Sequence, residues 1–187
     1  MKFKGIVLAG GRSSRFGEDK ALARVRGTRM IEKAIRLLEA LDLEPTVITS
    51  AARDYSFLRC RIERDLIPNK GPLGGIYTAC CLFKDYALLI LVCDMPLLTK
   101  PVLRMLMENH HEQQWVTVFD DPQGRIQPFP GIYESNLSSL IFEQIQTDRL
   151  SAGEFLKSIS KLKMMGSCFN TEVFSNVNEK KDIRQTS

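Results

Sequence analysis

Hydrophobic residues recur along the chain in two patterns that alternate from the N-terminus onward. Residues 2–9 and 86–93 form short, almost continuous apolar runs, which are typical of strands covered on both faces. In residues 30–41 the apolar positions recur at helical spacing, which predicts a helix with one face packed on a sheet. The same two patterns predict further strands at residues 46–50, 59–64, 115–119, 126–133 and 161–165, and further helices at residues 73–83, 100–108, 134–146, 152–159 and 179–183.

The alternation of strands and helices predicts an α/β fold. Strands separated by helices at this spacing form a mostly parallel sheet with helices on both faces, a three-layer α/β/α sandwich of the Rossmann-like kind. We find no repeat, low-complexity tract or linker, so we expect a single domain over residues 1–187. In such sheets ligands bind beyond the carboxyl ends of the strands. A site is therefore expected in the loops after Leu8, Ser50, Asp65 and Cys93.

Composition narrows the class of protein further. With 187 residues, of which 44% are hydrophobic and 26% charged, the chain can bury an ordinary core. The net charge of +4 suits an anionic substrate. The sequence has no clustered basic run, so nucleic-acid binding is not indicated. The number of cysteines, five, is odd and no CxxC pair occurs, which favours free thiols in a reducing compartment. We find no signal peptide and no apolar run of membrane-spanning length, so we expect a cytoplasmic protein that does not bind membranes.

Histidine offers no catalytic arrangement in this sequence. His110 and His111 are the only two histidines, and they are adjacent at the end of a predicted helix, among charged residues. There they favour the helix dipole and need no catalytic role. A Ser-His-Asp triad is not indicated.

The clearest chemical signal follows the first predicted strand. Residues 8–20 read LAGGRSSRFGEDK, in which Gly10 and Gly11 let backbone N–H groups approach a polyphosphate without obstruction by Cβ atoms. Arg15 and Lys20 add positive charge where pyrophosphate would leave. The pattern is neither GxGxxG nor GxxxxGK[ST]. A plain strand-to-helix turn is the alternative, and a glycine pair alone would favour it, but the whole constellation favours a phosphate site.

An aspartate follows the most apolar predicted strand. Asp94 comes directly after residues 86–93, so we expect it at the carboxyl end of a central strand. A carboxylate there can bind Mg²⁺, which accepts few protein ligands and otherwise binds water and substrate phosphates. The alternative is an aspartate that caps a turn before Pro96, which is common for an isolated Asp-x-Pro. Its position together with the glycine-rich loop favours the metal ligand.

Two further features follow the third predicted strand. Residues 71–75 read GPLGG and lead into a helix whose first N–H groups could bind a base edge or an anion. The alternative is that Gly74 and Gly75 only let the helix pack closely on the sheet, and the segment alone does not decide between the two. Asp65 could accept hydrogen bonds from a guanine or a ribose, and an exposed, solvated aspartate is the alternative.

Taken together, these motifs resemble one enzyme family. Residues 8–20 match the LAGGxSxRxGxxK signature of sugar-phosphate-type nucleotidyltransferases, and with DKAL at residues 19–22 the loop is similar to that of the molybdenum cofactor guanylyltransferases. The chain resembles that family again at residues 71–75, in CDMP at residues 93–96 and in FSNVN at residues 174–178. The matching segments follow one another in the same order as in the family, and they extend along essentially the whole chain. The resemblance implies a nucleotidyltransferase-type sheet and the transfer of GMP from Mg-GTP to molybdopterin, or its molybdenum-loaded form, with release of pyrophosphate.

The resemblance also implies a role for each matching residue. Lys20 would contact the phosphates, Asp94 would hold Mg²⁺, and Asn176 and Asn178 would lie near the pterin of the acceptor. Without the resemblance, capping of the last predicted helix would be the favoured role of these two asparagines. GTP and molybdopterin would be the substrates, Mg²⁺ the cofactor, and proteins of molybdenum insertion and molybdoenzyme maturation the partners. The other nucleotide-binding positions would be Leu8, Ala9, Gly10, Gly11, Asp65, Gly71, Pro72 and Leu73.

One position departs from the family pattern. Where the family usually carries an asparagine that helps to read the base, this chain has Ala52, which cannot hydrogen-bond a base edge. Either backbone groups and Asp65 are sufficient to read the base, or the base preference is weaker or different. Asp19 before the loop lysine favours the guanylyltransferase, because the other related transferases more often lack this aspartate. The alternatives are a cytidylyltransferase for the same cofactor, a transferase for a sugar or other phosphate, and a nucleotide-binding relative without turnover. The presence of Arg15, Lys20 and Asp94 argues against the last of these.

Overall fold

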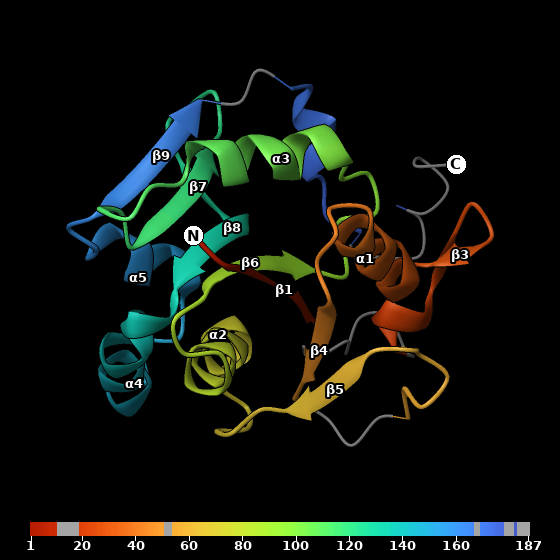
Figure 1. Ribbon diagram of the computed structural model, residues 1–187, viewed down its shortest axis with the longest axis horizontal. Coiled ribbons are helices and arrows are strands. Elements are labelled where there is room, and N and C mark those ends of the chain that lie inside the picture. Colours follow the sequence, from red (N-terminus) through yellow and green to blue (C-terminus); the bar gives the residue numbers. More distant parts are fainter. Residues whose placement is uncertain (11–18, 51–53, 167–168, 178–181, 183–187) are drawn as a thin grey trace.

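The computed structural model describes residues 1–10, 19–50, 54–166, 169–177 and 182. Its main feature is a seven-stranded sheet in the order β5-β4-β1-β6-β8-β7-β9, flanked by helices (Figure 1). The strands of this sheet are β1 (Phe3–Leu8), β4 (Pro45–Thr49), β5 (Arg61–Arg64), β6 (Ala87–Val92), β7 (Val116–Asp120), β8 (Ile126–Glu134) and β9 (Leu162–Gly166). The helices are α1 (Met30–Glu39), α2 (Gly71–Leu82), α3 (Lys100–Asn109), α4 (Ser138–Gln146) and α5 (Ala152–Lys157), with 3-10 turns η1 (Lys20–Leu22), η2 (Ser135–Leu137) and η3 (Thr171–Phe174).

Strand direction determines which strand ends share an edge of the sheet. β5, β4, β1 and β6 pair in parallel, whereas β8 pairs antiparallel with both β6 and β7. Since β9 is parallel to β7, both strands run in the same direction as β6. The carboxyl ends of all strands of this sheet except β8 therefore lie along one edge, and the loops after β1, β4, β5 and β6 leave from it. This arrangement confirms the predicted, mostly parallel α/β fold.

Helices cover both faces of this sheet, as the alternating apolar patterns predict. α2, α4 and α5 pack on one face, toward which Ile6 and Leu8 point, and α1 and α3 pack on the other, toward which Val7 and Ala9 point (Figure 1). In β6 every residue but the last is buried, because both faces of this central strand are covered. A shift of one residue would exchange the two faces, so burial fixes the register of the sheet and the positions of its loops.

Most predicted elements are confirmed to within a few residues, and the differences have local causes. α2 begins at Gly71 rather than at residue 73, with Pro72 in its first turn, where the missing N–H of proline breaks no helical hydrogen bond. The segment predicted as one helix at residues 134–146 is divided, since β8 continues to Glu134 and η2 precedes α4. Of the helical turn predicted at residues 179–183, only residue 182 belongs to the described residues.

A short hairpin between β1 and α1 is missing from the predicted pattern. It consists of β2 (Arg24–Val25) and β3 (Thr28–Arg29), which pair antiparallel. Arg26 and Gly27 form its two-residue turn with φ angles of 52° and 78°. This is the combination that tight hairpin turns require, and an arginine gives little sign of it in a sequence.

His110 lies after α3 as predicted, but its surroundings differ from the expected ones. Its side chain is buried, with Nδ1 2.8 Å from Oγ1 of Thr117 and Nε2 2.9 Å from Oε1 of Glu134. The neighbourhood is charged through the carboxylate of Glu134, but the ring is buried rather than placed among the charged residues next to it in the sequence. The ring instead connects α3 to β7 and β8 through hydrogen bonds in the core, which satisfies both of its nitrogens.

The cysteines within the described ranges are free thiols, as predicted. They are Cys60, Cys80, Cys81 and Cys93, whereas Cys168 lies outside the described residues. Burial raises the pKa of Cys93 to about 12, so this thiol stays protonated beside Asp94. In the described part of the chain, no helix is long and apolar enough to cross a membrane.

Gly131 in β8 offers a test of this packing. A Cβ atom placed there would lie 2.9 Å from Pro128 O, Tyr133 Cε2 and Val118 Cγ1, and the first of these is a backbone atom that cannot rotate away. We expect Gly131→Ala to lower the free energy of unfolding, measured by urea denaturation, by about 1–3 kcal/mol, the usual cost of overpacking. The matched control is Gly153→Ala, which should be neutral or slightly stabilising because the nearest atom there is 3.9 Å away. Equal stabilities of the two variants would contradict the tight packing at Gly131.

Candidate active site

The predicted loop lysine and the predicted strand-end aspartate meet at the carboxyl edge of the sheet. The Nζ atom of Lys20 lies 2.8 Å from Oδ2 of Asp94, although the residues are 74 positions apart in the sequence. Their side chains are largely buried, with exposed fractions of 16% and 24%. Opposite charges attract each other more strongly in such a partly desolvated place than in open water. The pair therefore fixes the ammonium group of Lys20 beside the end of β6.

Within the described part of the chain, Asp94 also has an oxygen without a protein partner. Its Oδ1 atom is buried and has no hydrogen-bond partner among the described residues. A buried carboxylate oxygen without a partner is unfavourable, and a bound cation would offset that cost. Within the described ranges no group of three or more His, Cys, Asp or Glu side chains could hold a metal ion. Mg²⁺ needs only one or two carboxylates when substrate phosphates and water complete its shell, so Asp94 fits this ion.

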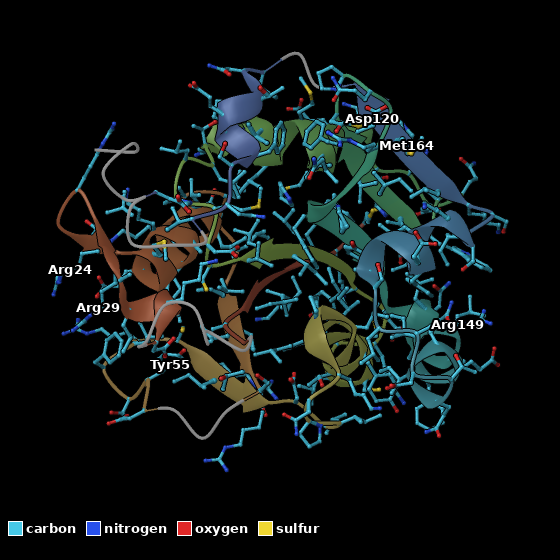
Figure 2. All side chains as sticks on the ribbon, turned by 180° about the vertical axis from the view of Figure 1, so that it is seen from behind. Arg24, Arg29, Tyr55, Asp120, Arg149 and Met164 are labelled. Carbon is cyan, nitrogen blue, oxygen red and sulfur yellow. The ribbon has the colours of Figure 1, made fainter. Side chains whose placement is uncertain are left out.

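Lys20 is positioned by the residue before it. Lys20 begins η1, and Asp19 caps this turn, because its Oδ1 accepts a 3.0 Å hydrogen bond from the N–H of Ala21. The other carboxylate oxygen of Asp19 accepts a 2.7 Å hydrogen bond from the hydroxyl of Tyr55, a buried residue that Figure 2 labels. Tyr55 belongs to the segment after β4. This hydrogen bond therefore connects the chain segments that follow two neighbouring strands, and no pattern in the sequence indicates it.

The C-terminal segment lies against the same site. The N–H of Val177 donates a 2.9 Å hydrogen bond to the backbone carbonyl of Asp94. The side chain of Val177 is buried against Val25 and Met30, which hold this segment on the β2–β3 hairpin and α1. Asn176 is thereby positioned one residue from the contact with Asp94. Its role near the acceptor stays a prediction.

The glycine-rich loop is described as far as Gly10. A Cβ atom at Gly10 would lie 2.6 Å from Oγ of Ser50, so glycine is what allows this close approach of the two loops. Leu8 and Ala9 are buried, and their carbonyl and N–H groups, respectively, make hydrogen bonds to neighbouring strands and loops. Their side chains face the core. A nucleotide at this edge would therefore meet the backbone of Gly10 rather than the side chains of these two residues.

Asp65 lies over the first turns of α2, directly after β5. Cβ atoms placed at Gly74 and Gly75 would lie 3.8 and 3.6 Å from its carboxylate oxygens. A Cβ atom at Gly75 would also lie 2.8 Å from Cδ2 of Leu8, so close packing of helix on sheet is one role of these glycines. Burial raises the pKa of Asp65 to about 6, because desolvation disfavours the charged form.

The other predicted site residues divide into those that the structure describes and those that it does not. At the start of α2, Gly71 and Pro72 are exposed, whereas the side chain of Leu73 is fully buried in the core. Gly71 has a φ angle of 58°, which favours glycine. The predicted residues outside the described ranges are Gly11, Arg15 and Asn178, together with the departing position Ala52.

Fold and site together define the class of this protein. A glycine turn and a lysine–aspartate pair at the carboxyl edge of a mostly parallel sheet are typical of α/β enzymes that bind nucleotide phosphates. The family model of the MobA-like NTP transferase domain matches residues 5–162. The chain therefore belongs to this family and is a nucleotidyltransferase.

The sequence matches to known relatives extend over most of the chain. A probable molybdenum cofactor guanylyltransferase of Flavobacterium johnsoniae is 33% identical over 154 residues, which span 82% of this chain and 80% of the relative. A protein of the same name from Thermococcus sibiricus is 31% identical over 189 residues, with 97% and 95% covered. Among solved structures, molybdopterin-guanine dinucleotide biosynthesis protein A of Archaeoglobus fulgidus has a similar fold, with a TM-score of 0.83 at 18% identity and 98% and 96% covered. This likeness confirms the nucleotidyltransferase type of the sheet.

The raised pKa of Asp65 predicts a pH dependence of stability. Folded Asp65 titrates at about pH 6 and an unfolded aspartate at about pH 4, so the folded state binds more protons between these values and loses stability as the pH rises through them. The full shift corresponds to about 3 kcal/mol, and partial exposure reduces it to about 1–2 kcal/mol. We expect the free energy of unfolding of the wild type to fall by this amount, relative to Asp65→Asn, between pH 4 and 7.

Urea denaturation at a series of pH values measures this difference. Asp54→Asn is the control, because Asp54 is exposed and hydrogen bonds from Ser56 lower its pKa. That variant should keep the wild-type fall in stability. Parallel pH profiles of the wild type and Asp65→Asn would show that burial does not raise the pKa of this carboxyl group.

Proposed function

We propose that this chain transfers GMP from GTP to molybdopterin, or to its molybdenum-loaded form, and thereby makes the guanine dinucleotide cofactor. The proposal is carried by the Lys20–Asp94 pair, in which one carboxylate oxygen binds the lysine and the other has no partner among the described residues. Nucleotidyl transfer needs positive charge around the α-phosphate and the leaving pyrophosphate. A lysine beside a carboxylate that fits Mg²⁺ supplies this charge. GTP as the donor of GMP and molybdopterin as its acceptor are inferred from the names of the relatives.

The reaction is a single in-line displacement at the α-phosphorus of GTP. An oxygen of the acceptor phosphate forms the new bond to this phosphorus, while the bond from the phosphorus to the oxygen shared with the β-phosphate breaks. The electron pair of the broken bond leaves with pyrophosphate. Since the acceptor provides the nucleophile, no covalent intermediate on the protein is needed, and the residues act through position and charge.

Each residue of the pair has its own task in this reaction. Lys20 donates to phosphate oxygens of GTP and counters the charge that develops on the leaving pyrophosphate. Asp94 holds Mg²⁺, which when bound supplies charge neutralisation at the α-phosphate. The ion pair between Lys20 and Asp94 positions the ammonium group before substrates arrive, at a distance of 2.8 Å from the carboxylate.

The two substrates bind on opposite sides of Asp94 along the carboxyl edge of the sheet. Toward β5 lie Asp65 and the start of α2, next to the glycine-rich loop. These features suit the nucleotide. Near Asp94 itself lies Asn176, and beyond it the sheet continues through β8, β7 and β9. The acceptor therefore binds over this second half of the sheet.

Guanine is the base that Asp65 suits best. Guanine carries an N1–H group and a 2-amino group side by side, and one carboxylate can accept a hydrogen bond from each. The Watson–Crick edge of cytosine has an amino donor beside acceptors and no such pair. Because burial raises the pKa of Asp65 to about 6, guanine binding strengthens as the pH rises through this value. Asp65 compensates in this way for the asparagine that Ala52 replaces.

The cellular setting follows from the same proposal. The protein works in the cytoplasm with Mg²⁺ as its cofactor. It passes its product to proteins that insert molybdenum or mature molybdoenzymes, and it needs neither nucleic acid nor membrane for this reaction.

Pyrophosphate release from ATP, GTP, CTP and UTP, each with Mg²⁺ and with or without molybdopterin, tests the proposal. We expect release only when GTP and molybdopterin are both present, with kcat/KM for GTP at least about tenfold above that for CTP, which is about 1.4 kcal/mol of discrimination. Reactions without molybdopterin are the control for simple hydrolysis. Equal turnover of GTP and CTP would overturn the assignment of guanine. No release in any combination would overturn the transfer to molybdopterin.

A further inference from the structure

A second carboxylate with an unused oxygen lies at the carboxyl edge of the sheet. Asp120 is the last residue of β7, and its Oδ1 atom is buried without a hydrogen-bond partner among the described residues. The next residue, Asp121, shows the contrast, since its carboxylate accepts hydrogen bonds from the backbone N–H groups of Gln123 and Arg125 and from the Arg125 side chain. An unpaired buried carboxylate oxygen is unfavourable in the folded state. Packing therefore does not explain why Asp120 is an aspartate.

An open place lies on the neighbouring strand beside Asp120. In the parallel pairing of β7 with β9, Asp120 is aligned with Gly166, so a side chain at Gly166 would lie next to that of Asp120. Gly166 is exposed, and a Cβ atom placed there would have no atom within 4 Å. Met164, aligned with Val118 and on the same face of β9 as Gly166, is 45% exposed, and Figure 2 labels it in the same part of the molecule as Asp120. The carboxylate of Asp120 thus lies on the strand next to an open place and near an exposed apolar side chain.

This place lies along the same edge as Asp94. β7 and β6 run in the same direction and are separated by β8 alone, with Ile90, Gly131 and Val118 aligned across the three strands. Strands are about 4.8 Å apart, so the two strand ends are roughly 10 Å apart. Asp120 lies on the side of Asp94 away from Asp65 and the glycine-rich loop. A molecule whose phosphate reaches Lys20 and Asp94 could extend along the edge to Asp120.

The chemistry of Asp120 restricts what it can bind. A carboxylate repels phosphate, so the phosphate end of an acceptor belongs near Lys20 and an uncharged, hydrogen-bond-donating end belongs near Asp120. Two parallel N–H donors on a planar group match two carboxylate oxygens best. The amino-oxo-pyrimidine ring of a pterin presents such a pair, its N3–H and its 2-amino group. Met164 can lie against the face of such a ring, because its thioether makes favourable contacts with aromatic groups.

We propose that Asp120 is the specificity residue for the acceptor and binds the N3–H and 2-amino groups of its pterin ring, with Gly166 leaving room for the ring and Met164 packing on it. This inference rests on the proposed function, because it assumes that the acceptor is a pterin. It goes beyond that function by assigning recognition of the acceptor to the end of β7. The unpaired oxygen of Asp120 is then satisfied only when the acceptor is bound.

Binding of two matched fluorescent probes tests this assignment. The probes are 6-hydroxymethylpterin and 6-hydroxymethyllumazine, which differ in that the lumazine has an oxygen in place of the 2-amino group. We expect the wild type to bind the pterin at least about tenfold more tightly, since losing a hydrogen bond to a charged group commonly costs this much. In Asp120→Asn this preference should fall to about twofold or less, because the amide presents a donor to the donors of the ring. Asp121→Asn is the matched control and should keep the wild-type preference.

Two further measurements separate recognition from a structural role. The affinity for GTP should stay within about twofold of the wild type in both variants. The melting temperature of Asp120→Asn should not fall, because Oδ1 of Asp120 makes no hydrogen bond to the described residues that the substitution could break. A fall of more than about 4 °C would indicate that Asp120 supports the fold and would overturn the proposal. Equal binding of the two probes by the wild type, binding of neither, or an unchanged preference in Asp120→Asn would overturn it as well.

Turnover distinguishes failure of this inference from failure of the proposed function. If GMP transfer to molybdopterin occurs and Asp120→Asn leaves the KM for molybdopterin unchanged, the inference is wrong and the function stands. If the wild type prefers the pterin probe and Asp120→Asn does not, but no GMP is transferred to molybdopterin, the pterin site stands and the function is wrong. We expect Asp120→Asn to raise the KM for molybdopterin by about tenfold or more, with little change in kcat. The lost interaction would hold the substrate equally well in the ground state and in the transition state.

Discussion

The ion pair between Lys20 and Asp94 depends on the parallel pairing of two central strands. β1 and β6 are aligned from Phe3 with Ala87 to Leu8 with Val92, so both chains leave the sheet at the same edge. A lysine in the loop after one strand can then reach an aspartate after the other at 2.8 Å. Antiparallel pairing would put the two residues at opposite edges.

Several distant segments hold this pair in position before any substrate binds. Tyr55 anchors Asp19 beside Lys20, and the N–H of Val177 binds the carbonyl of Asp94. Groups fixed in this way can stabilise charge in a reaction without rearranging at that moment. Asp94 and Asp120 each have a buried oxygen without a partner among the described residues, and both lie at the same edge of the sheet. Such local conflicts are expected where a protein binds something, since they persist despite their cost to the fold.

The elements of this fold could be predicted because each follows from burial. An apolar run covered on both faces indicates a strand such as β6, and helical spacing indicates a helix such as α1. The reversed direction of β8 could not be predicted, because direction leaves no mark on an apolar run. Lys20 and Asp94 could be predicted, since each belongs to a motif next to a strand. Tyr55, His110 and Asp120 could not, because their importance lies in what they contact or fail to contact in the folded chain.

The most direct test of whether Asp94 is the metal ligand of this nucleotidyltransferase is its binding of Mn²⁺ in the presence of GTP. This binding is measured through the enhancement of water proton relaxation. Mn²⁺ takes the same kind of oxygen ligands as Mg²⁺ and reports its own binding. We expect the wild type to form a ternary complex with Mn²⁺ and GTP, and Asp94→Asn to bind Mn²⁺ at least about tenfold more weakly. Asp121→Asn, as a control carboxylate outside the site, should resemble the wild type. Equal affinity of the wild type and Asp94→Asn for Mn²⁺ in the presence of GTP would contradict the assignment of Asp94.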